Sequence, residues 1–528
     1  MLDCVVIGYN DINFHEAAVR ARAGDKTSGA YATKKLNSVL HKGRRLTITE
    51  LLNATLAEAT GKDPQLNVFN QPSLTVAYLV GFLRTRGLET EFVNLFSHEK
   101  ERLRTLLAER PRSVAITTTF YTEIEPLREI IDLVREHAPD TRIIVGGPFI
   151  FNLSTRLNDE TQDYLFHKVG ADFYVFDSQG ESTLTVLVRA LKAGTSIDAV
   201  PNLIWKDGET LRRTSRMVEK NALQTIPWTS FDPSWLTPNV YLRTARSCPF
   251  SCSFCNYPTV AGEHVVEEVE AIVRQLRQLR EIGTRNVVFI DDTFNVPLAR
   301  FKQLLRRMIE ERLDLRWMSF FRCSNADDEA FELMERSGCV GVFLGIESGD
   351  ETMLKHMTKF AKVDRYRYGI RRLKEHGIFT YASLIVGFPG ETEDSVQRTI
   401  DFVNETAPTF NYAQIYYHDE RAPIGARANE FGITGGGFAW AHNTMDWHKA
   451  VEMNLHLYRS VETSQIMPGD SGSAFGAFYL LQSGVSLERL APFLDVAREM
   501  MLSGFGDVEP KGFDRLVSIF RQGIRPKG

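Results

Sequence analysis

Three cysteines, Cys248, Cys252 and Cys255, lie within one short segment of the chain. Neighbouring thiols at this spacing indicate metal or redox chemistry, and an odd number of them fits a set of disulfides poorly. A structural zinc site takes four ligands, and no fourth Cys or His lies nearby in the sequence. Three thiolates suit a [4Fe–4S] cluster with one open iron, because thiolate is the usual protein ligand of such clusters. Such an open iron can bind a substrate or a cofactor.

The same spacing, with the aromatic Phe254 directly before the last cysteine, resembles the cluster motif of radical S-adenosylmethionine (SAM) enzymes. In that family the open iron binds the amino and carboxylate groups of SAM. The resemblance implies that the three cysteines are catalytic cluster ligands and that Phe254 lies near the adenine of SAM. Three unrelated thiols or a partial zinc site are the alternatives.

The cysteines follow the first of six strand-like segments that alternate with helical ones between residues 240 and 416. This rhythm predicts an open, partial (βα)6 barrel of the TIM type over residues 239–430, with chemistry at the carboxyl ends of the strands. The predicted strands are Val240–Ala245, Asn286–Ile290, Arg316–Phe320, Gly341–Leu344, Thr380–Val386 and Tyr412–Tyr416.

Polar residues follow these strands, and a carboxylate there can bind ribose hydroxyls or an ammonium group. Any one of them is alternatively a helix cap or a surface charge. Their convergence with the cysteines on one rim favours a binding role. The resemblance implies that SAM is bound by Phe254, Glu347, Ile385, Val386 and Phe388. Arg322 and Asp292 are further candidate SAM residues. Of the neighbours Asp291 and Asp292, one is expected to bind SAM or substrate and the other to cap the next helix.

Strand-like and helical segments also alternate over residues 1–200, which predicts an α/β, doubly wound, Rossmann-like domain with a parallel sheet. Ligands of such sheets bind beyond the carboxyl ends of the strands. Hydroxyls and glycines at these ends are alone weak evidence of a site, since turn glycines are common in this fold. Together with the cysteine motif they resemble a cobalamin-binding domain. The resemblance assigns cobalamin contacts to Thr117, Thr118, Gly146, Gly147, Gln179 and Gly180.

Two parts of this half depart from the simple pattern. Residues from about 11 to 65 read as a helical insertion, with helices expected over Ala32–Arg45 and Thr47–Thr60. Residues 201–238 are rich in proline and are predicted to be a linker. The histidine motif that coordinates cobalt in many cobalamin domains is missing, and His15 is more simply a surface or helix histidine. We therefore expect the cobalt to have no histidine ligand from the protein.

The C-terminal region, residues 431–528, is predicted to be a helical extension that covers the substrate. Its start combines aromatic, histidine and acidic side chains at a density that fits the wall of a substrate pocket. An aromatic patch that anchors the C-terminal helices is an equal alternative. The candidate substrate residues, here and just before this region, are Tyr416, His418, Arg421, Trp440 and His442.

The chain has 528 residues, enough for several domains, and a net charge of −5. This balance gives no general attraction to nucleic acid or to an anionic membrane. No apolar run reaches the length of a membrane span. The six cysteines show no disulfide pattern, which predicts a reducing cytoplasm.

Motifs along nearly the whole chain resemble the phosphinate P-methyltransferases of phosphinothricin-type antibiotic pathways, a cobalamin-dependent radical SAM subfamily. They are residues 3–11, 93–96, 116–119, 291–297, 381–391 and 440–446 together with the cysteine loop. The resemblance implies that a methyl group passes from SAM through methylcobalamin to a substrate radical, on phosphinate phosphorus or on an unactivated carbon. It implies a [4Fe–4S] cluster, SAM and cobalamin as cofactors.

The partners implied by the resemblance are a small molecule, either a phosphinate or an amino-acid-like natural-product intermediate, and an external electron donor such as flavodoxin. Two other functions stay open. A cyclase or rearrangement enzyme would use the same cofactors without methyl transfer. A non-enzymatic cofactor sensor would cleave no SAM.

Overall fold

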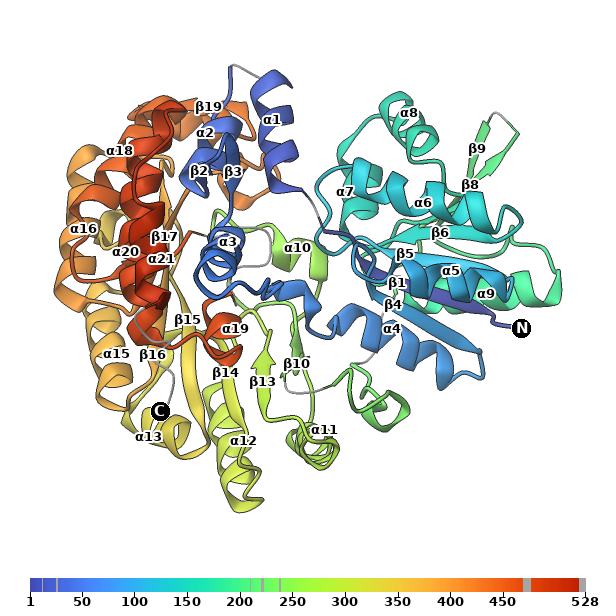
Figure 1. Cartoon of the computed structure of the whole chain (residues 1–528). Coiled ribbons are helices and arrows are strands. Elements are labelled where there is room, and N and C mark those ends of the chain that lie inside the picture. Colours follow the sequence, from blue (N-terminus) through green and yellow to red (C-terminus); the bar gives the residue numbers. More distant parts are fainter. Residues whose placement is uncertain are drawn as a thin grey trace. The chain divides into compact units, whose positions relative to one another are not determined.

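The computed structural model describes residues 1–11, 13–24, 27–208, 210–219, 223–236, 239–468 and 476–521. The chain divides into two compact units, whose elements are coloured along the sequence in Figure 1. The first unit comprises Met1–Ile12, Phe69–Leu242 and Glu270–Asn286, and the second comprises Asn13–Val68, Arg243–Val269 and Val287–Gly528. The domain boundaries given above are functional assignments and stay predictions.

The first sheet has seven strands in the order β4-β1-β5-β6-β7-β8-β9. The strands from β4 to β7 in this order run parallel, and β8 and β9 add an antiparallel edge. They are β1 (Cys4–Tyr9), β4 (Thr90–Leu95), β5 (Ser113–Thr117), β6 (Arg142–Gly146), β7 (Phe173–Val175), β8 (Leu203–Asp207) and β9 (Thr210–Arg213). The last two strands lie in the predicted linker, part of which therefore extends the sheet.

Residues of β1 pack alternately on the two faces of this sheet, as the period of a strand requires. Val5 and Ile7 belong to a core that also contains Leu103 and Leu127 from helices. On the opposite face, a methyl group added to Gly8 would lie 2.7 Å from Val76. The helices are α4 (Leu74–Arg84), α5 (Lys100–Ala108), α6 (Glu125–His137), α7 (Pro148–Arg156), α8 (Asp159–Val169) and α9 (Glu181–Ala193). Helices on both faces of a parallel sheet confirm the doubly wound fold.

The second sheet has seven strands in the order β10-β13-β14-β15-β16-β17-β21. They are β10 (Asn239–Leu242), β13 (Asn286–Phe289), β14 (Arg316–Phe321), β15 (Cys339–Glu347), β16 (Phe379–Val386), β17 (Phe410–Ile415) and β21 (Gln465–Ile466). The pairs from β14 to β21 are parallel. The order in the sheet follows the order in the chain, which confirms the open barrel. The short strand β21 was not predicted.

Helices connect successive strands of this sheet. They are α11 (Val269–Ile282), α12 (Leu298–Glu310), α13 (Asp328–Arg336), α14 (Glu351–His356), α15 (Val363–Glu375) and α16 (Glu393–Thr406). Helices α12, α13, α15 and α16 lie in sequence side by side along the sheet (Figure 1). This layer leaves the carboxyl ends of the strands to the loops.

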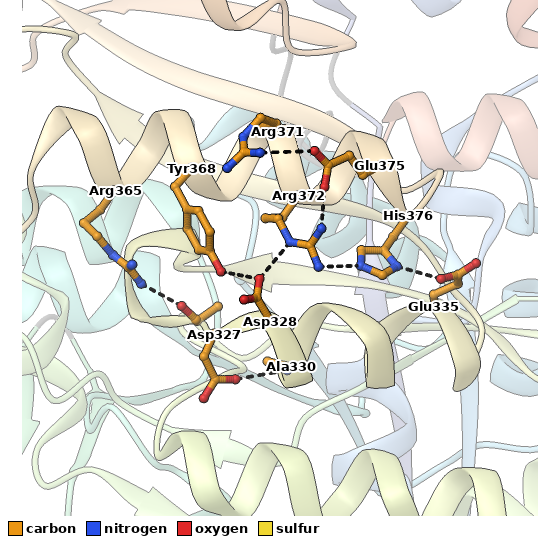
Figure 2. A network of polar contacts seen from close by, with 11 residues as sticks. Asp327, Asp328, Ala330, Glu335, Arg365, Tyr368, Arg371, Arg372, Glu375 and His376 are labelled. Atoms are coloured by element: carbon orange, nitrogen blue, oxygen red, sulfur yellow. Dashed lines mark hydrogen bonds and ion pairs between the residues drawn. The ribbon is translucent and has the colours of Figure 1, made fainter.

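A polar network joins α13 to α15 on the protein surface (Figure 2). The Asp328 carboxylate accepts a hydrogen bond from the Tyr368 hydroxyl (2.5 Å) and forms an ion pair with Arg372 (2.9 Å). The His376 ring lies 2.6 Å from the Glu335 carboxylate. One exposed ion pair contributes at most about 1 kcal/mol, but these share partners and act as a network. They fix the two helices that follow β14 and β15, whose ends carry predicted site residues.

The segment 13–68 is only partly helical. Its helices are α1 (Phe14–Gly24), α2 (Ala30–Leu36) and α3 (Ile48–Thr60), and the hairpin strands are β2 (Val39–His41) and β3 (Arg44–Leu46). The predicted helix over 32–45 is therefore wrong beyond α2. Lys42 and Gly43 both adopt left-handed backbone conformations (φ 50° and 72°) and form the two-residue turn of the hairpin.

The same segment packs within the second unit. The Arg45 guanidinium forms an ion pair with Asp507 (2.6 Å), and the Gly29 amide donates to the Phe438 carbonyl (2.8 Å). The segment thus contacts the C-terminal part of the chain. The order of the elements along the sequence does not predict this contact.

The C-terminal part confirms the helical extension, with α18 (Trp447–Ser460), α19 (Gly476–Gln482), α20 (Leu487–Ser503) and α21 (Phe513–Arg521). A small antiparallel sheet precedes it, formed by β18 (Thr434–Gly436), β19 (Ala439–His442) and β20 (Met445–Asp446). Among the described residues, no helix combines the length and the apolar character needed to cross a lipid bilayer.

Candidate active site

The three cysteines lie on one loop, residues 247–256, called here the cluster loop. It connects the short strand β11 (Ala245–Arg246) to the helix α10 (Tyr257–Ala261). Ser253 anchors its middle. The Ser253 amide donates to the Met357 carbonyl and its hydroxyl donates to the His356 carbonyl, both at 2.8 Å. The Ser253 carbonyl accepts from the Ile424 amide at 2.9 Å. The loop is therefore held at the end of α14 and next to the helical turn Pro423–Arg427.

The thiols of this loop differ in burial. Cys252 is buried, whereas Cys248 and Cys255 are partly exposed. Burial, with smaller contributions from the charges of the other two cysteines, raises the pKa of Cys255 to about 11. Burial also raises the pKa of Cys252, while Lys359 and Arg322 oppose that shift.

These thiols fit an iron–sulfur cluster. Among the described residues, no group of three or more Cys, His, Asp and Glu side chains is arranged to hold a single metal ion. A cluster does not require that closeness, because each thiolate binds a different iron. Binding of the cluster requires the thiols to lose their protons. Because burial raises the pKa of two of them, cluster binding is coupled to proton release.

The chain that leads into the cluster loop is clamped by Asp291 and Arg300. The fully buried Asp291 carboxylate accepts hydrogen bonds from the Thr244 amide (2.6 Å), the Ala245 amide (2.9 Å) and the Thr244 hydroxyl. The Arg300 guanidinium donates to the Thr244 carbonyl (2.9 Å). Burial raises the pKa of Asp291, and these hydrogen bonds lower it. Asp291 thus acts on the loop through the backbone.

Glu347 ends β15 in a left-handed backbone conformation (φ 65°), after a register shift that follows Gly345. Such irregularities turn a side chain out of the regular ladder, often beside an active site. The Glu347 carboxylate lies 2.7 Å from the Lys359 ammonium. The guanidinium of Arg322, which follows β14, lies 3.7 Å from the centre of the Phe250 ring and donates to the Lys359 carbonyl. Two predicted SAM residues, Glu347 and Arg322, are therefore brought together beside the cluster loop.

An aromatic row continues from the cluster loop to the end of β16. The rings of Phe254 and Phe388 meet edge to face at 6.4 Å, and Phe388 meets Tyr416 in the same way at 5.2 Å. Ile385 and Val386, at the end of β16, are buried. The row thus joins Phe254 of the cluster loop to Phe388, in the turn that directly follows Ile385 and Val386.

Asp292, which follows β13, lies near the C-terminal end of the cluster loop. Although its side chain reaches solvent, surrounding protein raises its pKa to about 6, and the charge of Arg243 together with a hydrogen bond to Tyr257 limits that rise. Its charge in turn raises the pKa of Cys255. Asp292 is therefore near the thiols, while its neighbour Asp291 supports the backbone.

Glu391, which was not assigned from the sequence, holds the turn after β16. Its buried carboxylate accepts a hydrogen bond from the Gly387 amide at 2.5 Å. Burial raises the pKa of Glu391 from 4.5 to about 8. The turn carries Phe388, so this acid positions a predicted SAM contact.

Glu391 should make the folded protein less stable as pH rises. A carboxyl whose pKa is raised by folding contributes its stability below its unfolded pKa of 4.5 and loses it as pH rises through about 8. Glu391→Gln keeps a neutral group at all pH values. We expect thermal unfolding midpoints to fall between pH 5 and pH 8 by several degrees less in this variant than in the wild type. The exposed Glu393→Gln should behave like the wild type, and an unchanged pH dependence in Glu391→Gln would contradict the assignment.

The predicted substrate residues form a buried group, with one exception. The Tyr416 hydroxyl hydrogen-bonds with the His418 ring at 2.9 Å, and the Trp440 ring N–H donates to the Tyr416 carbonyl at 2.8 Å. His442 stacks on Trp440 and lies 3.2 Å from the Gly387 carbonyl. Arg421 is exposed. Tyr416 and His442 thus contact the turn after β16, while Trp440 and His418 contact Tyr416. A contact with substrate stays a prediction for all five.

In the first unit, the predicted cobalamin residues lie at the carboxyl ends of β5 and β6 and before α9. The Thr117 hydroxyl donates to the Gly8 carbonyl (2.8 Å), and the Thr118 hydroxyl donates to the Gly146 carbonyl (2.9 Å). Gly147 has a left-handed backbone (φ 109°), and a methyl group there would lie 2.9 Å from the Thr118 hydroxyl. The glycine and the hydroxyls therefore already take part in contacts that stabilise this edge of the sheet.

Gln179 and Gly180 form the turn before α9. The backbone N–H of Gln179 donates to the Asp177 carboxylate at 3.1 Å. A methyl group on Gly180 would lie 2.7 Å from a methyl of Val175, so only glycine fits. The close approach that explains this glycine is to β7.

An aromatic surface at the same strand ends was not assigned from the sequence. Tyr9, the last residue of β1, stacks on Phe69 at 4.0 Å and meets Phe120 at 5.9 Å. Phe120, which follows β5, is 46% exposed. Flat apolar rings beside hydroxyls and glycines fit a large planar ligand such as a corrin.

His15 lies on α1. Its Nδ1 atom accepts a hydrogen bond from the Arg45 amide at 3.2 Å. This contact joins α1 to the hairpin strand β3. The absence of a histidine ligand to cobalt stays a prediction.

Two families of known proteins match the chain. The radical SAM superfamily matches residues 242–403, and the B12 binding domain matches residues 68–186. The first range contains the cluster loop and the strands from β13 to β16. The second contains the strands from β4 to β7.

Among curated relatives, an uncharacterized methyltransferase of Pyrococcus horikoshii is 27% identical over 64% of this chain and 72% of its own length. The anaerobic magnesium-protoporphyrin IX monomethyl ester cyclase of Cereibacter sphaeroides is 26% identical over 62% of this chain and 55% of its own length. The chain thus spans about half the length of the cyclase.

Solved structures share the fold along most of the chain. The radical SAM methyltransferase TsrM of Kitasatospora setae, with cobalamin and a [4Fe–4S] cluster bound, has a TM-score of 0.61 at 17% identity and covers 99% of this chain and 100% of its own. The cobalamin-dependent radical enzyme OxsB has a TM-score of 0.58 at 13% identity over 85% of this chain and 81% of its own.

The two matched domains have [4Fe–4S], SAM and cobalamin as their cofactors, in agreement with the thiols, the strand ends and the aromatic surface. The chain therefore combines a radical SAM domain with a B12-binding domain, the combination that is typical of cobalamin-dependent radical SAM enzymes.

Proposed function

We propose that the protein is a methyltransferase that moves a methyl group from SAM to phosphinate phosphorus or to an unactivated carbon of a small natural-product intermediate. One observation carries the proposal: a loop that carries three thiols and Phe254 is fastened beside Glu347 and Phe388 in a chain that also has a B12-binding domain. The methyl acceptor is assigned from the resemblance of the sequence motifs.

The roles of individual residues follow from their chemistry. Cys248, Cys252 and Cys255 would hold the cluster through their thiolates. The Glu347 carboxylate would accept hydrogen bonds from the N–H groups of the SAM amino group, since hydrogen bonds to an ionised acceptor are the stronger ones. When bound, the cluster supplies the electron that cleaves SAM, and cobalamin supplies the methyl group.

The aromatic row favours a dry site. Phe254 and Phe388 offer apolar edges to the adenine, and Phe388 is in turn supported by Tyr416. Excluding water protects reactive species from side reactions. The turn after β16 keeps its shape through Glu391 and His442, which bind the Gly387 amide and carbonyl respectively.

At the strand ends of the first sheet, Thr117, Thr118 and the glycines would lie along the edge of the corrin, and Phe120 would pack on its ring. A threonine hydroxyl that donates to a carbonyl can still accept hydrogen bonds from the amide side chains of cobalamin. We also propose an external one-electron donor such as flavodoxin and a cytoplasmic location.

Counting products tests the proposal. Protein reconstituted anaerobically with all cofactors, and given methyl-deuterated SAM with a candidate phosphinate or carbon substrate, should yield labelled product in mass spectrometry. Each turnover should also give one S-adenosylhomocysteine and one 5′-deoxyadenosine. Formation of 5′-deoxyadenosine alone with the true substrate would exclude methyl transfer, and no SAM cleavage at all would exclude a radical enzyme.

A cyclase or rearrangement enzyme is the second candidate. The similarity to the magnesium-protoporphyrin cyclase, which extends over 62% of this chain, supports it. Such an enzyme would give an unlabelled product of altered connectivity, so the same experiment separates the two.

A further inference from the structure

The Thr293 hydroxyl contacts the first thiol of the cluster loop. Its oxygen lies 3.7 Å from the Cys248 sulfur, a distance at which a hydroxyl and a sulfur form a hydrogen bond. Between a hydroxyl and a neutral thiol, either group can be the donor. A thiolate that binds iron has no proton to donate, so the hydroxyl must then be the donor. Thr293 follows β13 and is half-buried.

The turn that carries Thr293 is fixed by the residues that follow it. Phe294 is buried and stacks on Phe289, with the ring centres 4.2 Å apart. The fully buried Asn295 side chain donates to the Arg322 carbonyl (2.9 Å) and accepts from the Arg322 amide (3.0 Å). These contacts hold the Thr293 backbone, so its hydroxyl is a preorganised donor that needs no rearrangement to act.

The chain that carries Cys248 is held by the same part of the structure. The Asp291 carboxylate, two residues before Thr293, accepts from two backbone amides of the segment that leads to Cys248. Ser247 is buried in a left-handed backbone conformation (φ 67°), and its hydroxyl donates to the Gly262 carbonyl at 2.7 Å. One carboxylate thus ties the segment that carries the thiol to the segment that carries the hydroxyl.

We infer that Thr293 is a positioning residue that donates a hydrogen bond to the Cys248 thiolate and thereby raises the reduction potential of the iron–sulfur cluster. Reduction adds one electron, and the sulfur ligands share the added negative charge. A hydrogen bond to one of these sulfurs therefore stabilises the reduced state more than the oxidised state. This inference rests on the proposed binding of the cluster by Cys248.

The electron comes from the external one-electron donor proposed above. No bond forms or breaks at Thr293, and its proton stays on the hydroxyl oxygen. A threonine that only filled space in the turn could be replaced by valine, which has the same branched shape, without changing the potential. The inference therefore makes a claim about one hydroxyl group and one electron-transfer step.

The test measures the midpoint potential of the cluster in the anaerobically reconstituted full-length protein. Wild type is compared with Thr293→Val, which removes the hydroxyl, and with Thr293→Ser, which keeps it. Thr259→Val is the matched control, because Thr259 is an exposed threonine of α10, directly after the cluster loop. A titration with redox mediators, followed by the electron paramagnetic resonance signal of the reduced cluster, gives each midpoint.

We expect the equilibrium constant for one-electron reduction to fall about threefold to tenfold in Thr293→Val, which corresponds to a midpoint about 30 to 60 mV more negative. Thr293→Ser and Thr259→Val should stay near the wild-type midpoint. An unchanged midpoint in Thr293→Val with full iron content, or an equal shift in Thr259→Val, would overturn the inference.

Iron and sulfide contents show whether each variant holds its cluster. If Thr293→Val loses the cluster, Thr293→Ala is titrated in its place and should show the same negative shift. Loss of iron in both variants would show that the hydroxyl is needed to hold the cluster, and the role in setting the potential would be refuted. Wild-type protein that takes up no iron would refute the proposed function, whereas a wild-type cluster whose potential does not depend on Thr293 refutes the inference alone.

Discussion

Cys252→Ala should leave the protein without its iron–sulfur centre. Cys252 is the buried member of the three thiols, and its loop is fixed by Ser253 on one side and by the turn to Cys255 on the other. Two thiolates cannot replace three, because removing even an indirect contact of a metal site commonly costs ten- to a hundredfold. We expect iron and sulfide after anaerobic reconstitution to fall to background, and SAM cleavage to fall by more than about a hundredfold.

Cys339→Ala is the matched control. Cys339 begins β15, is buried, and loses the same single sulfur on substitution. It should keep its iron and its activity, with only a small loss of stability from the missing buried atom. Iron retained near the wild-type level in Cys252→Ala would show that the loop is not the cluster site. Equal iron loss in both variants would show that iron depends on the fold in general.

Local patterns predicted the second sheet closely. Predicted strands over 286–290 and 316–320 correspond to β13 and β14, because buried β runs bounded by helices carry a strong signal. The hairpin at 39–46 was missed for a local reason. Its turn is Lys42-Gly43, whereas the strongest signal for such a turn is Asn or Asp before glycine.

The long-range contacts of the site could not be predicted. Lys359 contacts Glu347 because a turn with two left-handed residues reverses the chain after α14. Arg322, which donates to the Lys359 carbonyl, follows a different strand, β14. Nothing near Lys359 in the sequence distinguishes it from a solvated surface lysine. Aromatic density around Trp440 was visible, but whether such rings face a ligand or each other depends on packing. In the structure, the Trp440 ring N–H donates a hydrogen bond to the Tyr416 carbonyl.

Asp291 and Asp292 are adjacent carboxylates at one strand end, and they have different roles that the sequence alone could not distinguish. Asp291→Leu should destabilise the second unit by about 3 kcal/mol or more, because two buried amides and the Thr244 hydroxyl lose their acceptor. The guanidinium of Arg300 would also keep its buried charge with one fewer carboxylate nearby. We expect a lower thermal midpoint and reduced retention of iron, since β11 leads directly into the cluster loop.

Asp291→Asn separates the hydrogen bonds from the charge. Its amide oxygen can still accept from both backbone amides, and the Thr244 hydroxyl can rotate to accept from the new amide group. This variant should therefore recover most of the stability and iron that Asp291→Leu loses. Asp292→Leu should keep both, because Asp292 supports no backbone amide of the loop, and should weaken only SAM binding. If Asp291→Leu kept its iron while Asp292→Leu lost it, the two roles would be reversed, and the clamp at Thr244 would not be what holds the cluster loop in place.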